Sequence, residues 1–323
     1  MRVLVTGGAG YIGGVVTAML VEEGHAVTVL DDLSTGHADA VHPGARFVQG
    51  TVRERAAEIL REGFDAVLHF AAKSVVSESV AHPDLYWSGN VGTSLALLEA
   101  MRATGTERLV FSSTAAVYGE PESVPITEDA AVRPTNPYGA TKAAIDAALT
   151  EHARMHGTAA VSLRYFNVAG AYQGLGERHT VETHLIPNVL RVALGERESV
   201  SVFGEDYPTP DGTCVRDYIH VADLARAHLL ALGRARAGRH EVLNLGNGAG
   251  FSVREVLEVC REVTGHAIPA VASPRRPGDP AVLVASSDRA GAVLDWRPER
   301  SSLHDIVADA WAFHRDRAGA AVD

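Results

Sequence analysis

Short apolar runs rich in β-branched residues alternate with longer amphipathic segments along the first half of the chain. The runs, which we expect to form strands, cover residues 2–5, 26–30, 46–49, 66–70, 108–113 and 160–166. Segments of helical length separate them, near residues 11–23, 53–62, 84–104 and 137–156. This alternation predicts an α/β fold of βαβ units, with a parallel sheet covered by helices on both faces. Right-handed crossovers then give a doubly wound sheet that binds ligands at the carboxyl ends of its strands.

The alternation stops near residue 170, where Gly, Pro and polar residues become frequent, as in YQGLGERHT, GEDYPTPDGT and SPRRPGDP. Helical patterns continue near residues 185–195, 221–234, 253–264 and 302–317. We therefore expect two domains. Residues 1–170 would bind a dinucleotide, and residues 171–323 would form a smaller, mixed α/β lobe for the substrate, with some elements interleaved.

Charge and composition narrow the class of ligand. The chain has 29 basic and 40 acidic residues and a formal net charge of −11, which argues against nucleic-acid binding. No apolar run approaches the roughly 18 residues that span a bilayer. The chain begins at once with a predicted strand, so we expect no signal peptide, no membrane contact and a cytoplasmic location. Two cysteines and 15 scattered histidines predict neither a disulfide framework nor a metal site.

The sequence TGGAGYIG (residues 6–13) follows the first predicted strand and opens the first helix. Gly7, Gly10 and Gly13 let the backbone turn tightly and approach a pyrophosphate, whose charge the helix N-terminus stabilises. Asp31 ends the second predicted strand, where a carboxylate accepts a hydrogen bond from a ribose hydroxyl and repels a 2′-phosphate. The pattern predicts a Rossmann domain that binds NAD in preference to NADP.

The stretch NPYGATKAAID (residues 136–146) places Tyr138 four residues before Lys142, one of only two lysines in the chain. Residues at this spacing share one face of a helix. An ammonium group beside a phenol, with a cationic nicotinamide close by, favours the phenolate and lowers a pKa that is otherwise near 10, so the phenol can act as a general base. A further hydroxyl is available from Ser112, Ser113 or Thr114. The alternative is an exposed helix on which the two residues are neighbours by chance, and the surrounding motifs decide between them.

Together these motifs resemble the extended short-chain dehydrogenase/reductase family, and within it the nucleotide-sugar 4-epimerases. General marks are TGGAGYIG, HFAA (69–72), FSSTAAVYG (111–119), PYGATK (137–142) and LRYFNVAG (163–170). More specific are HTVETHLIP (179–187), YPTPDGTCVRDYIHVADLA (207–225) and PRRPGD (274–279). Ala115 and Ala116 follow Thr114, where the related 4,6-dehydratases carry an Asp-Glu pair that moves protons. The glutamate usual in decarboxylases and mannose dehydratases is also missing from this stretch, which favours an epimerase.

The resemblance implies an isomerase that reversibly epimerises C4 of UDP-glucose and UDP-galactose through a 4-keto intermediate, with bound NAD as the transient hydride acceptor. It implies that Tyr138 removes the proton of the sugar 4-hydroxyl, Lys142 binds the nicotinamide ribose, and Thr114 hydrogen-bonds the reacting oxygen. Further implied cofactor contacts are Gly7, Gly10, Tyr11, Ile12, Gly13, Asp31, Asp32, Thr51, Val52, Phe70, Ala71, Ala72, Asn90, Ser112, Tyr165 and Phe166. Further implied substrate contacts are Asn167, His184, Leu185, Ser201, Phe203, Arg216, Arg276, Asp279 and Leu283, with the arginines at the phosphates. The family also suggests a homodimer through the helices at 84–104 and 137–156.

Some positions depart from the pattern of the family. Thr51 stands where an Asp usually holds adenine, the Gly-Thr of residues 92–93 comes one place early, and Gly89 replaces a common cofactor-contacting Asn. These changes bear on the tightness of NAD binding. Thr114 replaces the more usual Ser and keeps the hydroxyl.

Two alternative functions stay open. The first is 4-epimerisation of another nucleotide-sugar, such as UDP-N-acetylglucosamine and UDP-N-acetylgalactosamine or a UDP-uronic acid. Leu283 bears on it, because relatives strict for glucose and galactose tend to carry a bulky tyrosine there. The second is an NAD-binding sensor without catalysis, which the joint presence of Tyr138, Lys142 and Thr114 disfavours.

Overall fold

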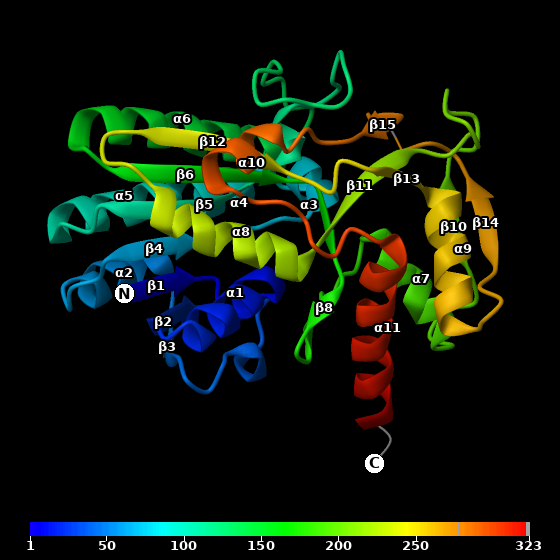
Figure 1. Ribbon diagram of the computed structural model, residues 1–323, viewed down its shortest axis with the longest axis horizontal. Helices are drawn as coiled ribbons and strands as arrows, with labels where there is room; N and C mark the ends of the chain where they lie inside the picture. Colours follow the sequence, from blue (N-terminus) through cyan, green and yellow to red (C-terminus); the bar gives the residue numbers. More distant parts are fainter. Residues whose placement is uncertain (277, 321–323) are drawn as a thin grey trace.

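Seven parallel strands form the central sheet of the larger lobe, in the order β12-β6-β5-β4-β1-β2-β3 (Figure 1). The computed structural model describes residues 1–276 and 278–320. The strands are β1 (Arg2–Thr6), β2 (Ala26–Asp31), β3 (Arg46–Gln49), β4 (Ala66–His69), β5 (Arg108–Thr114), β6 (Ala159–Tyr165) and β12 (His240–Leu245). The doubly wound fold is confirmed, and its order reverses between β1 and β4, which is where such sheets bind ligands.

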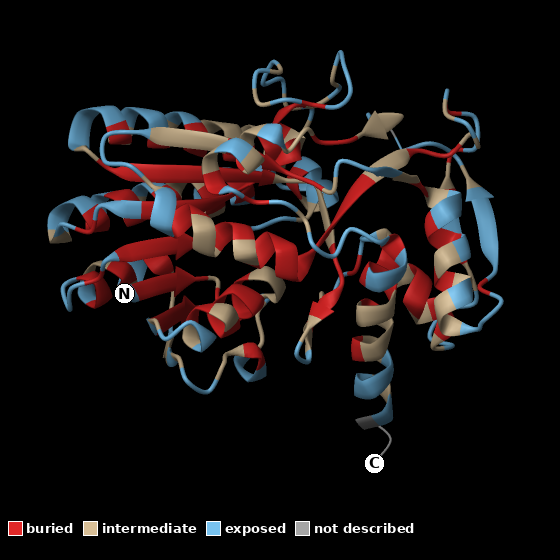
Figure 2. Cartoon of the chain, in the orientation of Figure 1, coloured by how far each residue is buried: buried red, intermediate tan, exposed pale blue. Residues whose placement is uncertain are grey.

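Helices cover both faces of this sheet, as predicted. One layer contains α1 (Tyr11–Glu22), α8 (Val221–Arg234) and α10 (Asp288–Leu294), and the other contains α2 (Val52–Leu60), α5 (Thr93–Thr104) and α6 (Pro137–His156). Side chains of β1 alternate between the two layers, with Val3 and Val5 in one apolar cluster and Leu4 in the other. The sheet is therefore buried on both sides, as the red strands of Figure 2 show.

The helix expected at 84–104 is interrupted in the structure. It begins as α4 (Pro83–Tyr86), continues as a π-helical turn over Trp87–Gly92, and becomes α5; a further helix, α3 (Val76–Ala81), precedes it. The π-helical turn coincides with the segment in which Gly-Thr comes one place early, and π-bulges often lie at functional sites. It holds Asn90 inside, only 1% exposed.

The smaller lobe packs three helices against two small sheets, which confirms a mixed α/β second lobe. The helices are α7 (Leu185–Ala193), α9 (Val253–Thr264) and α11 (Leu303–Ala320). One sheet pairs β10 (Val200–Phe203) with β14 (Ala270–Ser273). The other is built around β11 (Val215–His220), which pairs with β13 (Gly250–Ser252), β15 (Val282–Leu283) and β7 (Asn167–Ala169). The strands β8 (Ala171–Tyr172) and β9 (Leu175–Gly176) form a short hairpin between the lobes.

The chain passes more than once between the lobes. After residue 170 the chain forms β11, the strand of the smaller lobe that pairs with β7. It returns to the larger lobe to form α8 and β12, and later α10. A division of function at residue 170 therefore stays a proposal. β12 was not predicted, because its sequence HEVLNL forms the edge of the sheet and only its last three residues are buried.

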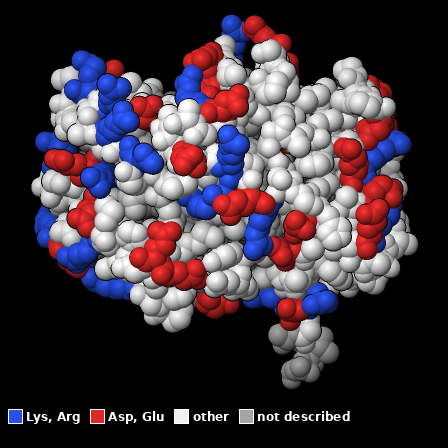
Figure 3. Space-filling model, in the orientation of Figure 1, with Lys and Arg blue, Asp and Glu red and all other residues white. Residues whose placement is uncertain are grey.

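Acidic and basic side chains are intermixed over the face shown in Figure 3. Several of them pair, as Arg178 does with Asp39 at 2.7 Å. Within the described ranges, we find no helix whose length and hydropathy would let it cross a lipid bilayer.

Candidate functional site

Tyr138 and Lys142 lie on the first turns of α6, next to the carboxyl end of β5. Asn136 caps this helix by accepting a 2.9 Å hydrogen bond from the Gly139 amide, and Pro137 occupies its first position. Lys142 donates from Nζ to the carbonyl oxygen of Ser112 at 2.7 Å, and its Nζ lies 5.9 Å from the centroid of the Tyr138 ring. The predicted pair therefore shares one face and meets the end of β5.

Thr114 supplies the third hydroxyl of this group. It is the last residue of β5, 8% exposed, and its side chain accepts from the Ala116 amide at 3.2 Å. The hydroxyl also interacts with the phenol of Tyr138. Of the three hydroxyls considered at this strand end, Ser112 instead bonds the phenol of Tyr165, and Ser113 bonds Asp146.

Burial governs the protonation of the pair. It raises the pKa of Tyr138, and the Thr114 hydroxyl only partly opposes that rise. Burial also lowers the pKa of Lys142 to about 8, although the Asp146 carboxylate favours the charged form. The expected lowering of the phenol pKa is therefore not found among the protein groups alone, because desolvation of the phenolate outweighs the nearby hydrogen bond.

A buried ion pair supports α6 from inside. Asp146, one turn after Lys142, accepts from Arg164 at 2.8 and 3.0 Å, and both side chains are 7% exposed. Arg164 in turn donates to the phenol of Tyr118, whose hydroxyl donates to Asn244 at 2.6 Å. The network joins α6, β6 and β12, so the helix that carries Tyr138 is fixed to the sheet.

Tyr86 contacts the site and was not anticipated from the sequence. Its ring lies edge-to-face with that of Tyr138, with centroids 6.4 Å apart. Its hydroxyl bonds the carbonyl oxygen of Val75 at 2.6 Å and Glu78 at 2.8 Å. It is fully buried at the end of α4, and no motif in the sequence singled it out.

The loop between β1 and α1 fits the phosphates of a dinucleotide. A Cβ atom at Gly13 would lie 2.2 Å from the carbonyl oxygen of Gly7, and one at Gly7 would lie 2.5 Å from the Ala71 amide nitrogen. Gly7 also has φ of +75°, which favours glycine. Gly10 precedes α1 without a side-chain cap, so the first amides of this helix are available to an anion.

Other residues predicted to hold the cofactor surround this loop. Tyr11 donates from its hydroxyl to the Gly170 carbonyl oxygen at 2.6 Å and so joins the loop to the smaller lobe. Ile12, Phe70 and Ala71 are partly buried against the two layers of the core. Ala72 follows in the same loop after β4 and is also partly buried.

Asp31 lies at the end of β2, beside the glycine loop. Its carboxylate accepts from the Ala9 amide at 3.0 Å and from the Leu33 amide at 2.8 Å. Burial raises its pKa, against the effect of these two amides. Asp32, the next residue, is exposed and caps the turn by accepting from the Ser34 amide at 2.9 Å.

Thr51 and Asn90 already have protein partners. Thr51 forms a capping box with Glu54 at the start of α2, followed by the buried Val52. The Asn90 amide bonds both backbone groups of Lys73, at 2.8 and 3.0 Å, and the hydroxyl of Thr141 at 3.2 Å. In the structure, Asn90 therefore connects the loop after β4 with α6.

The expected sugar contacts meet around β11. Asn167 on β7 pairs with Tyr218, and Leu283 on β15 lies opposite Arg216. Arg216 bonds the carboxylate of Asp279, which brings two of the expected ligands of the nucleotide together. Phe166 and Leu283 both pack against the cluster of Ala115, Val117, Tyr118 and Ile126, directly beyond Thr114. These contacts bring residues of the smaller lobe, including Leu283, close to Thr114.

The other expected substrate contacts lie farther along the smaller lobe. Ser201 and Phe203 share one face of β10, and the guanidinium of Arg276 stacks over the Phe203 ring at 4.0 Å. His184 immediately precedes α7 without a side-chain capping bond, and Leu185 is the first residue of that helix.

His184 also belongs to a group that the sequence did not predict. Its Nδ1 lies 2.8 Å from the carboxylates of both Glu177 and Glu182, and His179 lies 3.0 Å from Glu177. Burial opposes the charged imidazole, but the two carboxylates outweigh it and raise the pKa of His184 to about 10. The spacing Glu-x-His-x-x-Glu-x-His within residues 177–184 was the available signal.

Comparison with known proteins agrees with the family inferred from the motifs. The chain matches the NAD dependent epimerase/dehydratase family over residues 3–246. It is 60% identical to the UDP-glucose 4-epimerase of Corynebacterium glutamicum over 97% of this chain and 95% of the relative. The UDP-glucose 4-epimerase of Streptomyces lividans is 58% identical, over 97% of this chain and 96% of the relative.

Solved structures give the same result for the fold. A UDP-glucose 4-epimerase from Stenotrophomonas maltophila, with bound NAD and formylated UDP-arabinopyranose, matches with a TM-score of 0.95 and 40% identity over 99% of both chains. The chain therefore belongs to the NAD dependent epimerase/dehydratase family and is similar, over nearly its whole length, to the UDP-glucose 4-epimerases within it.

Proposed function

We propose that this protein interconverts UDP-glucose and UDP-galactose by inverting C4 of the sugar. The observation that carries the proposal is the convergence of Tyr138, Lys142 and Thr114 at the carboxyl end of β5, beside a loop that fits a dinucleotide. The similarity to UDP-glucose 4-epimerases over nearly the whole chain supports the choice of substrate.

In this function Tyr138 acts as the phenolate, which the positive charges of Lys142 and of bound NAD would favour, and accepts the proton of the sugar 4-hydroxyl while the hydrogen on C4 leaves with its electron pair. NAD, when bound, supplies the acceptor of that hydride and later its donor. Thr114 orients the reacting oxygen by hydrogen bonding, and Lys142 places a positive charge near the phenol. Return of the proton from Tyr138, after the keto sugar has presented its other face, completes the inversion with no net oxidation.

The residues around the glycine loop would hold the cofactor. The first amides of α1 and the close-packed Gly7 and Gly13 suit the pyrophosphate, and Asp31 suits the ribose hydroxyls. The smaller lobe would hold the nucleotide-sugar, with Arg216 and Arg276 donating charge-assisted hydrogen bonds to phosphate oxygens. Asn167 and Leu283 would contact the sugar.

A second candidate substrate is an N-acetylated UDP-sugar. Leu283 is partly buried against the cluster beyond Thr114, and it is shorter than a tyrosine in that position. The wall beside the sugar 2-position would therefore lie farther back.

Purified protein incubated with UDP-galactose, without added NAD, tests the reaction directly. We expect the anomeric NMR signals of UDP-glucose to grow until the two sugars reach equilibrium, because the cofactor is regenerated in each turnover. If no UDP-glucose forms even after NAD is added, the proposed reaction is wrong.

We also propose that the chain forms a homodimer through α5 and α6, in the cytoplasm. A groove of about 380 Å³ lies between these helices, lined in part by Leu95, Leu98, Ala148 and Met155. Leu95 and Met155 are 49% and 61% exposed, so a partner would bury substantial apolar area there.

The cysteines support the proposed cytoplasmic location. Within the described residues, Cys214 and Cys260 are free thiols, which suits a reducing compartment.

Light scattering after gel filtration tests the dimer. We expect twice the chain mass for the native protein and the chain mass for a Leu95→Glu/Met155→Glu variant. Val132→Glu, an apolar-to-acidic change at another exposed position, serves as the control. A monomeric native protein at micromolar concentration contradicts the dimer.

A further inference from the structure

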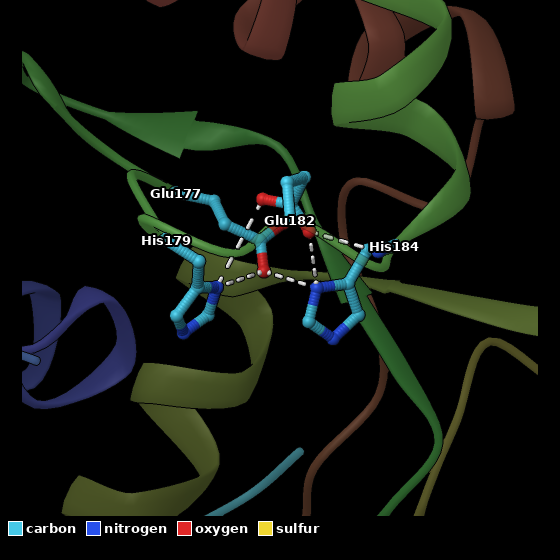
Figure 4. A group of neighbouring side chains, drawn as sticks. All are labelled: Glu177, His179, Glu182 and His184. Atoms are coloured by element: carbon cyan, nitrogen blue, oxygen red, sulfur yellow. Dashed lines mark hydrogen bonds and ion pairs between the residues drawn. The ribbon is translucent and has the colours of Figure 1, made fainter. Parts of the chain in front are cut away.

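Four side chains converge in the segment between the β8–β9 hairpin and α7, and we call Glu177, His179, Glu182 and His184 the Glu/His cluster (Figure 4). Each offers one ligand atom, and these atoms all lie within 4.8 Å of one another. Both histidines present Nδ1 to the carboxylates. The convergence is local, because all four residues lie within eight positions of the chain.

Charge in the Glu/His cluster demands a cation. The side chains of Glu177 and Glu182 are only 6% and 1% exposed, and two buried carboxylates are costly unless positive charge balances them. Throughout the part of the chain that the structure describes, neither carboxylate forms an ion pair with Lys or Arg. Balance therefore comes either from protons on both imidazoles or from one divalent cation with both imidazoles neutral.

The neighbouring side chains do not by themselves neutralise the two carboxylates. The Tyr11 phenol and the His314 imidazole lie close enough for the charges of the two carboxylates to affect their pKa values. Arg191 is nearby, but its guanidinium donates to the backbone carbonyl oxygen of His179 at 3.4 Å. Arg178 is paired with Asp39. Neither arginine is directed at the carboxylates.

Glu177 gives an independent indication of a missing ligand. One of its oxygens bonds both histidines, while Oε2 is buried and has no hydrogen-bond partner among the described residues. An unpaired oxygen of a buried carboxylate carries a full desolvation cost. A cation seated among the four side chains would coordinate that carboxylate and remove the cost.

Distances and ligand types identify the class of cation. A tetrahedral ion with bonds of about 2.1 Å separates its ligands by roughly 3.4 Å. The nitrogen–oxygen distances in the Glu/His cluster are 2.8, 2.8, 3.0 and 3.9 Å, so small side-chain shifts suffice. Two imidazoles with two carboxylates suit zinc and neighbouring first-row metals, whereas magnesium and calcium prefer oxygen alone.

We propose that the Glu/His cluster is a binding site for one divalent transition-metal ion, with zinc as the best match. An ion can enter from solvent, because the side chains of His184 and His179 are 49% and 29% exposed. His179 also lines a cavity of about 120 Å³ beside Gly10, Tyr11 and Arg178. Four protein ligands leave no open position for a reacting water, so the site is structural.

The site would fix the crossing between the two lobes. The Glu/His cluster follows the hairpin that packs between the lobes and ends at His184, immediately before Leu185, the first residue of α7. Tyr11, whose pKa burial raises and the charges of these carboxylates raise further, is the first residue of α1 after the glycine loop and bonds Gly170. A bound ion would hold this segment against the glycine loop whether or not the proposed reaction is the natural one.

Metal analysis of tag-free protein tests the proposal. Protein purified without chelator, and again after dialysis against ZnCl₂ and desalting, should contain about one zinc per chain. Calorimetric titration with ZnCl₂ of protein stripped of metal by EDTA and then desalted should give one site, and MgCl₂ at the same concentration should give none. Glu182→Gln and His184→Ala should each weaken zinc binding at least tenfold, as expected for loss of one ligand.

Two comparisons make the result decisive. His152→Ala removes one of a pair of histidines on α6 whose rings meet edge-to-face, with centroids 4.7 Å apart, and should leave zinc binding unchanged. Zinc should raise the melting temperature of the native protein but not of His184→Ala, a partly exposed position where the variant should fold. If native protein binds no zinc, or if both cluster variants bind it as tightly as native, the cluster is a protonated ion-pair network and the proposal is overturned.

Discussion

Lys142 and Tyr138 meet with the ammonium nitrogen 5.9 Å from the centroid of the phenol ring, and a 2.7 Å bond to the Ser112 carbonyl oxygen holds that nitrogen in place. The lysine is 2% exposed, so its charge is poorly screened by water. The pair thus combines a buried ammonium group with a phenol whose pKa burial raises. The first two predictions test the role of each group.

Tyr138→Phe should lower turnover of UDP-galactose by roughly a hundredfold or more, because general acid–base catalysis is typically worth that much. Binding of UDP should change little, since the proposed task of the phenol is proton transfer. Steady-state rates and calorimetric titration with UDP measure the two effects.

Tyr172→Phe provides the matched control. That phenol bonds Glu22 at 2.8 Å on the surface, so the same atom is removed away from the site. A Tyr138→Phe enzyme that keeps more than about a third of native turnover would show that another group is the base.

Lys142→Met should stabilise the fold at neutral pH while reducing activity. Burial lowers the lysine pKa from 10.5 to about 8, so between these values the unfolded chain binds more protons than the folded one. Stability therefore rises with pH across this window, and the cost of the buried charge is fully present below pH 8. The difference corresponds to about 3 kcal/mol, which the variant should gain at pH 7 and lose toward pH 10.5.

Urea denaturation of both proteins at several pH values from 7 to 10 measures this gap. The native protein should approach the stability of Lys142→Met as pH rises. A constant gap, or a variant that is less stable at pH 7, would mean that the bond to Ser112 outweighs the desolvation of the ammonium.

Asp31→Ala should relax the choice between NAD and NADP. The carboxylate repels a 2′-phosphate, and this repulsion disappears with the charge. Native and variant protein are incubated with either cofactor and desalted, and the retained nucleotide is extracted and quantified. Native protein should retain NAD almost alone.

Because Asp31 also accepts from two backbone amides, the melting temperature of the variant must be measured beside its cofactor content. Equal retention of NAD and NADP by the native protein would contradict the role given to Asp31.

The sequence predicted the parts of this protein that depend on local periodicity. The six strands from β1 to β6 and the helix carrying Tyr138 follow from alternating apolar runs and from the Asn136-Pro137 start of α6. The family was recognised from motifs such as TGGAGYIG (residues 6–13), in which tight turns and the close approach to phosphate fix the spacing of the glycines. These features need no knowledge of the distant parts of the chain.

Features that depend on tertiary contacts escaped the sequence. The edge strand β12 is buried only in its last three residues, where Leu243 and Leu245 join the core, and the π-helical turn carries Asn90, which bonds the backbone of Lys73 and the hydroxyl of Thr141. The raised pKa of Tyr138 depends on burial, which helical spacing does not report. The roles assigned to individual ligand contacts stay predictions.

Leu283 sets the last prediction, which concerns the width of the sugar pocket. It lies opposite Arg216 in the pairing of β15 with β11, and it packs against the apolar cluster beyond Thr114. A leucine has less reach than a tyrosine and no hydroxyl, so we expect measurable epimerisation of UDP-N-acetylglucosamine, weaker than that of UDP-glucose. Apolar walls discriminate by on the order of 10 to 200-fold per methylene-sized misfit, so Leu283→Tyr should depress the acetylated reaction by that order. The kcat/KM values for both substrates in the native protein, Leu283→Tyr and Leu283→Phe separate the effect of size from that of the hydroxyl. If the native protein shows no turnover of the acetylated sugar, neighbouring side chains fill the space and Leu283 does not widen the pocket.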